Sequence, residues 1–113
     1  MFARVTTYEL EEGRASESID AFQPAIDRVR TLDGFVDGLF LVERDGRHAI
    51  SMTLWETIDA MERSRVAASS ARNEAASDAG AEAISTYELE VGIRAGAADP
   101  TVAGLPLGGL GTA

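Results

Sequence analysis

A chain of 113 residues is long enough for one domain with a single small hydrophobic core. Its 19 acidic and 10 basic residues give a net charge of −9, which disfavours nucleic acid and anionic membrane surfaces as partners. The sequence has no cysteine for a disulfide or a zinc cluster, and no signal peptide or apolar run of 18 residues, so we expect a cytoplasmic protein.

The first half of the chain predicts a strand, a helix and a hairpin. Residues 2–10 are rich in β-branched and aromatic residues and precede Glu-Glu-Gly, which is typical of a strand and its end. From Ser16, a candidate N-cap, apolar residues recur every three or four positions to about Leu32, which predicts an amphipathic helix. Pro24 should kink this helix on its solvent side. Two β-rich runs, 34–43 and 48–56, flank Asp45-Gly46, a strong signal for a type I′ hairpin.

The second half predicts a helix, a strand and a tail. The helix should run from about Thr57 to Ala79 and stop at Gly80. Its core stripe consists mostly of small side chains: Met61, Ser64, Ala68, Ala71 and Ala75. Residues 83–92 predict the last strand, and the remainder is rich in Gly, Ala and Pro. We therefore divide the chain into a domain, 1–92, and a C-terminal tail, 93–113.

The order β-α-β-β-α-β is that of the ferredoxin-like α+β fold, in which two helices cover one face of a four-stranded antiparallel sheet. By alternation, we expect Ile50, Met52 and Leu54 to face the helices, and Ser51, Thr53 and Trp55 to face the other side. The run 35–42 is apolar on both sides, which favours burial on both sides. A second copy of the chain covering the bare sheet face would provide that burial.

The pentapeptide Thr-Tyr-Glu-Leu-Glu occurs twice, at 7–11 and 86–90. In this fold the first and fourth strands are usually neighbours and are not equivalent under duplication of the two halves. We therefore interpret the repeat as one strand pattern used twice, and not as a duplicated active site.

The runs RVTTYE (4–9), GFVDGLFLVERDGRHAISMTLWET (34–57) and STYELEVG (85–92) resemble the dimeric α+β barrel superfamily, and most of all its antibiotic-biosynthesis-monooxygenase-like (ABM-like) branch. The resemblance covers residues 2–92. It implies a homodimer whose sheet faces pack into a barrel with a cavity in each subunit. Members of that branch include cofactor-free oxygenases of aromatic polyketides and haem-degrading enzymes. The Asn, Trp and His constellation of the latter does not fit, because residues 57–79 lack histidine and the sole asparagine, Asn73, lies there.

The expected cavity face supplies the candidate site. Arg4, Thr6 and Tyr8 share one face of the first strand, and we expect an arginine to avoid the space between helices and sheet, so we place this face toward the cavity. The candidate catalytic residues are Tyr8, as hydrogen-bond or proton donor, Arg4, as partner of a phenolate or enolate, and Trp55, which would position an aromatic substrate. Thr6, Thr53 and Trp55 are the candidate substrate contacts. Alternatively, Trp55 packs in the dimer interface and Arg4 pairs with a glutamate across subunits.

No metal-ligand spacing, phosphate loop or cofactor motif is present, and we expect the only histidine, His48, to be exposed beside the hairpin turn. The resemblance therefore implies an ABM-like protein that acts on an aromatic or polyketide-like small molecule, and the lack of a visible cofactor motif fits a cofactor-independent monooxygenase. The alternative is a non-catalytic dimeric module that binds such a molecule.

For the C-terminal tail, the sequence suggests a separate hypothesis about a binding partner. Its residues Leu105, Leu107 and Leu110 stand among glycines and resemble the C-terminal targeting tails of encapsulin-shell cargo proteins, although Pro106 and the lack of a basic residue after Leu110 depart from that pattern. The resemblance implies a protein shell as a partner. The alternative is a flexible end, or one that folds over its own dimer.

Overall fold

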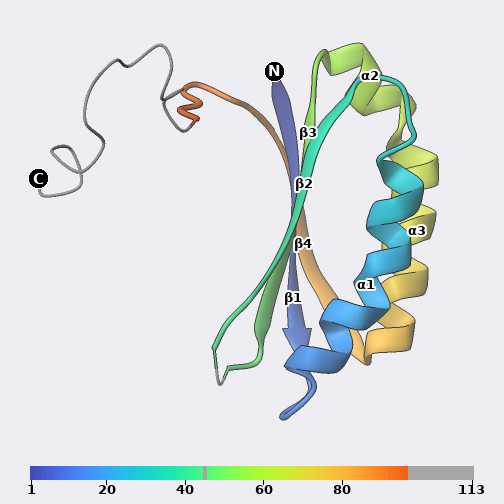
Figure 1. Ribbon diagram of the computed structural model, residues 1–113, viewed down its shortest axis with the longest axis vertical. Coiled ribbons are helices and arrows are strands. Elements are labelled where there is room, and N and C mark those ends of the chain that lie inside the picture. The colour runs from blue at the N-terminus through green and yellow to red at the C-terminus, as the bar shows by residue number, and fades with distance from the viewer. Residues whose placement is uncertain (45, 97–113) are drawn as a thin grey trace, which may run out of the picture.

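The structure, a computed structural model, describes residues 1–44 and 46–96, and these form the predicted ferredoxin-like α+β fold. One antiparallel sheet has the strand order β2-β3-β1-β4, and α1 and α3 lie together on one of its faces while the other face is bare (Figure 1). The elements are β1 (Phe2–Leu10), α1 (Ala15–Val29), β2 (Phe35–Val42), β3 (His48–Trp55), α2 (Ile58–Arg63), α3 (Arg65–Ala79) and β4 (Ala81–Glu90). None of the described helices is both long and apolar enough to cross a membrane.

The predicted second helix is two helices, and this is a correction. The helix is interrupted at Ser64. The hydroxyl of Ser64 donates a hydrogen bond to the carbonyl of Met61 (2.6 Å) and accepts one from the Arg4 guanidinium (3.1 Å). Thr57 caps the start of α2 by accepting a hydrogen bond from the Ala60 amide. Gly80 ends α3 in the left-handed conformation (φ +66°), as the sequence indicates.

The other boundaries differ by small amounts. Helix α1 begins at Ala15 and not after Ser16, and it continues through Pro24 as one helix. The hairpin joins β2 and β3 as predicted, but the type I′ geometry expected of Asp45-Gly46 lies outside the described residues. So do residues 97–113, including the leucines of the tail hypothesis, which stays a prediction.

The two faces of the sheet are the reverse of those expected, which is the main correction. Arg4, Thr6 and Tyr8 are 2%, 1% and 1% exposed, and they point toward the helices. Thr53 and Trp55 share this face, since Thr53 pairs with Arg4 across the β1–β3 ladder and Trp55 pairs with Phe2. Ile50, Met52 and Leu54 therefore lie on the bare face.

The small side chains of α3 explain this reversal. The face of α3 toward the sheet is built from alanines, and these leave space beneath the helix that large sheet residues fill: Ala68, Ala71, Ala75, Ala76 and Ala79. Trp55, Tyr8 and Arg4 occupy that space, and together with Phe22 of α1 they make up much of the core. The expectation that arginine avoids the helix side is wrong because this arginine is buried with its charge paired.

The bare face carries an apolar surface, here called the outer face. Its half-exposed members are on the edge strands, namely Leu39 and Leu41 of β2 and Tyr87 and Leu89 of β4. Val5, Ile50, Met52 and Leu54 fill the centre between them. The second strand is thus apolar on both sides as predicted, but only its Phe40 and Val42 side packs on the core of the single chain.

The strand pairing confirms that β1 and β4, which carry the two copies of the pentapeptide, are antiparallel neighbours. The two copies are nonetheless out of phase. Tyr8 faces the helices and is 1% exposed, whereas Tyr87 lies on the outer face and is 51% exposed. The register explains this difference, because Tyr87 pairs with Val5, which points to the opposite face from Tyr8 on β1. The repeat is therefore not a duplicated site, and its two tyrosines form a natural pair for comparison.

Candidate functional site

A small cavity lies between the sheet and the two long helices. Polar side chains of β1, β3 and α3 face apolar side chains, mainly of α1, and the lining residues are Arg4, Thr6, Phe22, Ala25, Ile26, Val29, Ser51, Thr53, Ala68 and Arg72. We call this the inner cavity. Its volume of about 20 Å³ is enough for one water molecule. An aromatic ligand can therefore enter only if the lining side chains move apart.

Tyr8 lies beneath this cavity in an aromatic cluster. Its ring meets that of Phe22 edge-on at 5.0 Å, and Phe22 stacks on Phe40 at 4.2 Å. The phenol oxygen shares a hydrogen bond of 2.9 Å with Ser51 Oγ. Burial raises the pKa of Tyr8, while the bond with Ser51 and the charge of Arg72 offset part of that rise. Tyr8 is therefore a neutral hydroxyl at physiological pH and can act as a donor but not as a base.

Arg4 is held by protein groups on all sides. Its Nε and Nη2 both donate to Glu88 Oε2, at 3.2 and 2.8 Å, Nη2 also donates to the Met61 carbonyl at 2.7 Å, and Nη1 donates to Ser64 Oγ. Glu88 also accepts a bond from Arg65 of α3. The glutamate partner belongs to the same chain, so the expected pairing across subunits is not needed. This arrangement joins β1 and β4 to the break between α2 and α3, and it makes Arg4 a positioning residue.

Trp55 is fully buried between sheet and helices, so the alternative that it packs in a dimer interface is wrong. Its indole Nε1 donates to Thr53 Oγ1 at 2.9 Å, its ring meets Phe35 edge-on, and the Arg4 guanidinium lies 5.9 Å from its centroid. Thr53 lines the inner cavity, whereas Trp55 does not line it but contacts it through its hydrogen bond to Thr53. A ligand that reaches Thr53 would therefore change the environment of the indole.

Sequence reasoning missed Arg72, which brings a positive charge to the cavity. This half-buried residue of α3 lines the cavity opposite Ser51 and Thr53. Burial lowers the pKa of its guanidinium. The available signal was spacing, since position 72 follows the buried Ala68 by four residues and so lies on the same side of the helix. Ser51 was not named as a candidate, although alternation places it on the same strand face as Thr53 and Trp55, which were named.

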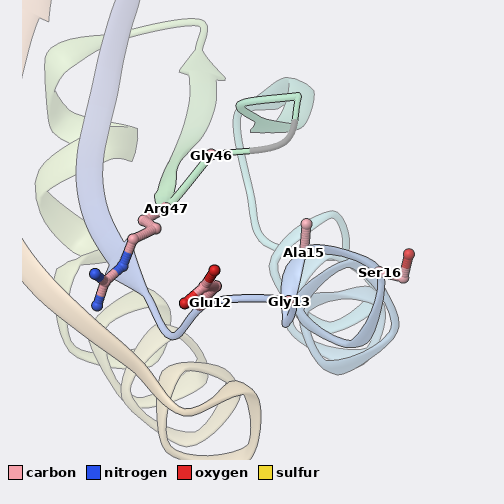
Figure 2. Close-up of a pocket in the computed structure, with 6 residues that line it drawn as sticks. All are labelled: Glu12, Gly13, Ala15, Ser16, Gly46 and Arg47. Atoms are coloured by element: carbon pink, nitrogen blue, oxygen red, sulfur yellow. The ribbon is translucent and has the colours of Figure 1, made fainter.

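Two other features do not form a site. His48 is exposed as expected and interacts with Glu43, with Nδ1 and Oε1 3.0 Å apart. A wider hollow, about 490 Å³, lies between the loop before α1 and the β2–β3 hairpin, and is lined by Glu12, Gly13, Ala15, Ser16, Gly46 and Arg47. Figure 2 shows the side chains of Arg47 and Ser16 pointing away from one another, so their polar groups do not converge. Within 1–44 and 46–96, no cluster of three metal-ligating side chains occurs.

Comparison with known proteins identifies the fold. No protein-family model and no curated protein sequence matches the chain. An antibiotic biosynthesis monooxygenase-like protein from Deinococcus radiodurans has a TM-score of 0.67 and 15% identity, over 88% of this chain and 100% of its own. SnoaB, a cofactor-independent oxygenase from Streptomyces nogalater, has a TM-score of 0.62 and 16% identity, over 82% and 94%.

A haem-degrading protein has the same fold. MhuD from Mycobacterium tuberculosis, solved with two haems bound, has a TM-score of 0.63 and 21% identity, over 85% of this chain and 100% of its own. At such identities the similarity establishes the fold and not the chemistry. The chain thus has the ABM-like fold that its sequence resembles.

Proposed function

We propose that this protein binds an aromatic or polyketide-like small molecule in the inner cavity and oxidises it as a cofactor-independent monooxygenase. One observation carries the proposal: the cavity wall combines the hydroxyls of Thr6, Ser51 and Thr53 with the guanidinium of Arg72 in a small domain. Each of these hydroxyls forms one hydrogen bond within the protein, to Thr86, Tyr8 and Trp55 respectively, and keeps the capacity for a further bond to a ligand oxygen, which favours a binding role. The similarity to SnoaB supports the oxygenase reading.

The apolar wall sets what binding requires. Phe22, Ile26 and Val29 of α1 oppose the polar groups, and the volume between the two sides admits one water. A planar aromatic ligand would have to separate α1 from the sheet. Its rings would then lie against Phe22, and its polar oxygen would point toward the hydroxyls. The ligand class that fits this division is a flat aromatic molecule with a polar oxygen on one edge.

The chemistry follows from the donors in the wall. An acidic C–H next to a carbonyl loses its proton to water, and the resulting enolate is held by the Tyr8–Ser51 hydroxyl pair and by Arg72. The carbanion then adds to O₂, and the protonated peroxide loses water to leave a ketone. One CH₂ group and one O₂ thus become one C=O group and one H₂O, and the substrate supplies all the electrons.

A second candidate function is a binding module without catalysis. The observation that favours it is the lack of a carboxylate or imidazole among the described residues lining the cavity, so that no side chain there is a ready general base. In that case the same wall binds an acidic aromatic molecule and releases it unchanged.

Oxygen uptake separates the two functions. With 1,8-dihydroxyanthrone as the probe, the oxygenase consumes one O₂ per anthrone faster than the uncatalysed reaction, and Tyr8→Phe removes most of that acceleration. Tyr87→Phe is the matched control, because Tyr87 occupies the equivalent place in the repeated pentapeptide but lies on the outer face. Binding without oxygen uptake establishes the module. If the protein neither binds nor oxidises the anthrone, both functions are wrong.

We also propose a homodimer through the outer face, since its leucines and Tyr87 are about half exposed in the single chain. Light scattering at tens of micromolar should give twice the 12.0 kDa chain mass. Leu41→Asp should produce a monomer. The control Val66→Asp, at an 83% exposed position on α3, should not. A wild-type monomer at this concentration contradicts the dimer.

A further inference from the structure

We infer that Arg72 is the specificity-determining residue of the inner cavity and that the cavity selects ligands carrying an anionic oxygen. This inference rests on the proposed small-molecule binding and specifies the charge of the ligand. Arg72 comes from α3, while the hydroxyls that face it come from β1 and β3. The cavity would therefore hold an anionic oxygen between a guanidinium on one side and hydroxyl donors on the other.

The charges around Arg72 do not balance. The ionisable side chains that act on its guanidinium are Tyr8, Arg4 and Glu88. Tyr8 is neutral, and Glu88 already pairs with Arg4 and with Arg65. Arg72 itself forms no hydrogen bond or ion pair with any residue that the structure describes. In a chain of net charge −9, this position is thus locally positive and lacks its own counter-charge.

The hydroxyls facing Arg72 are arranged to donate. Thr53 Oγ1 accepts from the Trp55 indole, so its hydrogen remains available, and it meets no acceptor within residues 1–44 and 46–96. When Tyr8 donates to Ser51, the Ser51 hydrogen is likewise left for a ligand. The lining contains two arginines and no acidic residue. Donors on both sides and no carboxylate favour an anion over a neutral or cationic group.

The volume indicates how the anion would sit. About 20 Å³ admits a single oxygen-sized group beside Arg72, and the apolar carbon frame must lie toward α1. A carboxylate or phenolate on the edge of an aromatic ring has this shape. An amide of the same size has the same shape without the charge, and it is therefore the matched neutral probe.

The test compares 2-naphthoate with 2-naphthamide on the full chain by NMR, following the indole N–H signal of Trp55, the only tryptophan. We expect the wild type to bind the carboxylate at least tenfold more tightly than the amide. Arg72→Gln should lose that preference by weakening carboxylate binding tenfold or more, with amide binding unchanged. Arg63→Gln, an exposed arginine of α2 outside the cavity lining, makes the same change in net charge and should keep the preference.

Each remaining outcome contradicts a defined part of this account. If the wild type binds both probes equally, or Arg72→Gln keeps the preference for the carboxylate, the inference is wrong while ligand binding in the cavity stands. Failure of both probes to bind the wild type overturns the proposed function as well. Should Arg72→Gln prove poorly folded by its NMR spectrum, Arg72→Lys serves instead. Arg72→Lys keeps the positive charge and should keep the preference for the carboxylate. Loss of that preference in Arg72→Lys would refute a role for charge.

Discussion

Replacing Arg4 tests whether this residue stabilises the fold by joining β1 and β4 to the break between α2 and α3. Arg4→Met keeps the volume of the side chain but removes the donors that bind Glu88, Ser64 and the Met61 carbonyl. Removing one partner of a buried ion pair costs about 3–5 kcal/mol. Glu88 is 28% exposed and keeps its bond to Arg65, so the lower end applies, about 3 kcal/mol.

Urea unfolding, followed by the fluorescence of the buried Trp55, measures this loss. At about 4–8 °C per kcal/mol for a domain of this size, a loss of about 3 kcal/mol should lower the midpoint of thermal unfolding by roughly 12–24 °C. Arg65→Met is the matched control, because it removes the other arginine on the same carboxylate from a position that is 57% exposed. Its expected cost is below about 1 kcal/mol. Equal losses in the two variants would refute the buried tie.

Three further predictions concern the polar residues of the core. Tyr8→Phe keeps the ring contacts but leaves Ser51 without its hydrogen-bond partner, so the free energy of unfolding should fall by about 1–2 kcal/mol. The control Tyr87→Phe should change it by no more than about 0.5 kcal/mol. Equal effects would contradict the opposite placement of the two tyrosines. Arg72→Met removes a half-buried charge without a counter-ion and should raise the free energy of unfolding by roughly 0.5–2 kcal/mol, measured in urea; a loss would show that the charge is paired. Burial raises the pKa of Glu88, but the hydrogen bonds from Arg65 and Arg4 outweigh this effect and hold the pKa below its usual 4.5. The stability that the ionised Glu88 contributes is therefore complete above pH 4.5 and is lost as the pH falls through the lower pKa of the folded state. Glu88→Gln should reduce the loss of stability at acid pH in unfolding measured against pH, and an unchanged slope would contradict this role of Glu88.

The fold was predictable because each element has a local signal of its own. Alternation, the Asp45-Gly46 turn and the three-to-four spacing before Leu32 act within a few residues, and they give the correct order of strands and helices. The break at Ser64 was not predictable in this way, because it depends on Arg4, 60 residues away in the sequence. Contacts between distant segments are invisible to periodicity.

The candidate site was predicted in its residues but not in its place. Arg4, Thr6, Thr53, Tyr8 and Trp55 do gather, yet they gather under the helices and not on the bare face. The error came from treating a charged side chain as a mark of the exposed side, when Glu88 neutralises it within the core. The small side chains of the α3 stripe were visible in the sequence, but they were not used to assign the sheet faces, although they require large side chains from the sheet beneath them.

The central claim is that the ligand lies between the helices and the sheet, and mapping backbone amide NMR shifts during titration with 2-naphthoate tests it most directly. The account predicts that the largest shifts fall on the cavity walls, in α1 near Phe22 and Ile26, in β3 at Ser51 and Thr53, and at Arg72. Leu39 and Leu89 on the outer face should move little. Shifts confined to the outer face, or to the hollow beside Arg47, would contradict the claim.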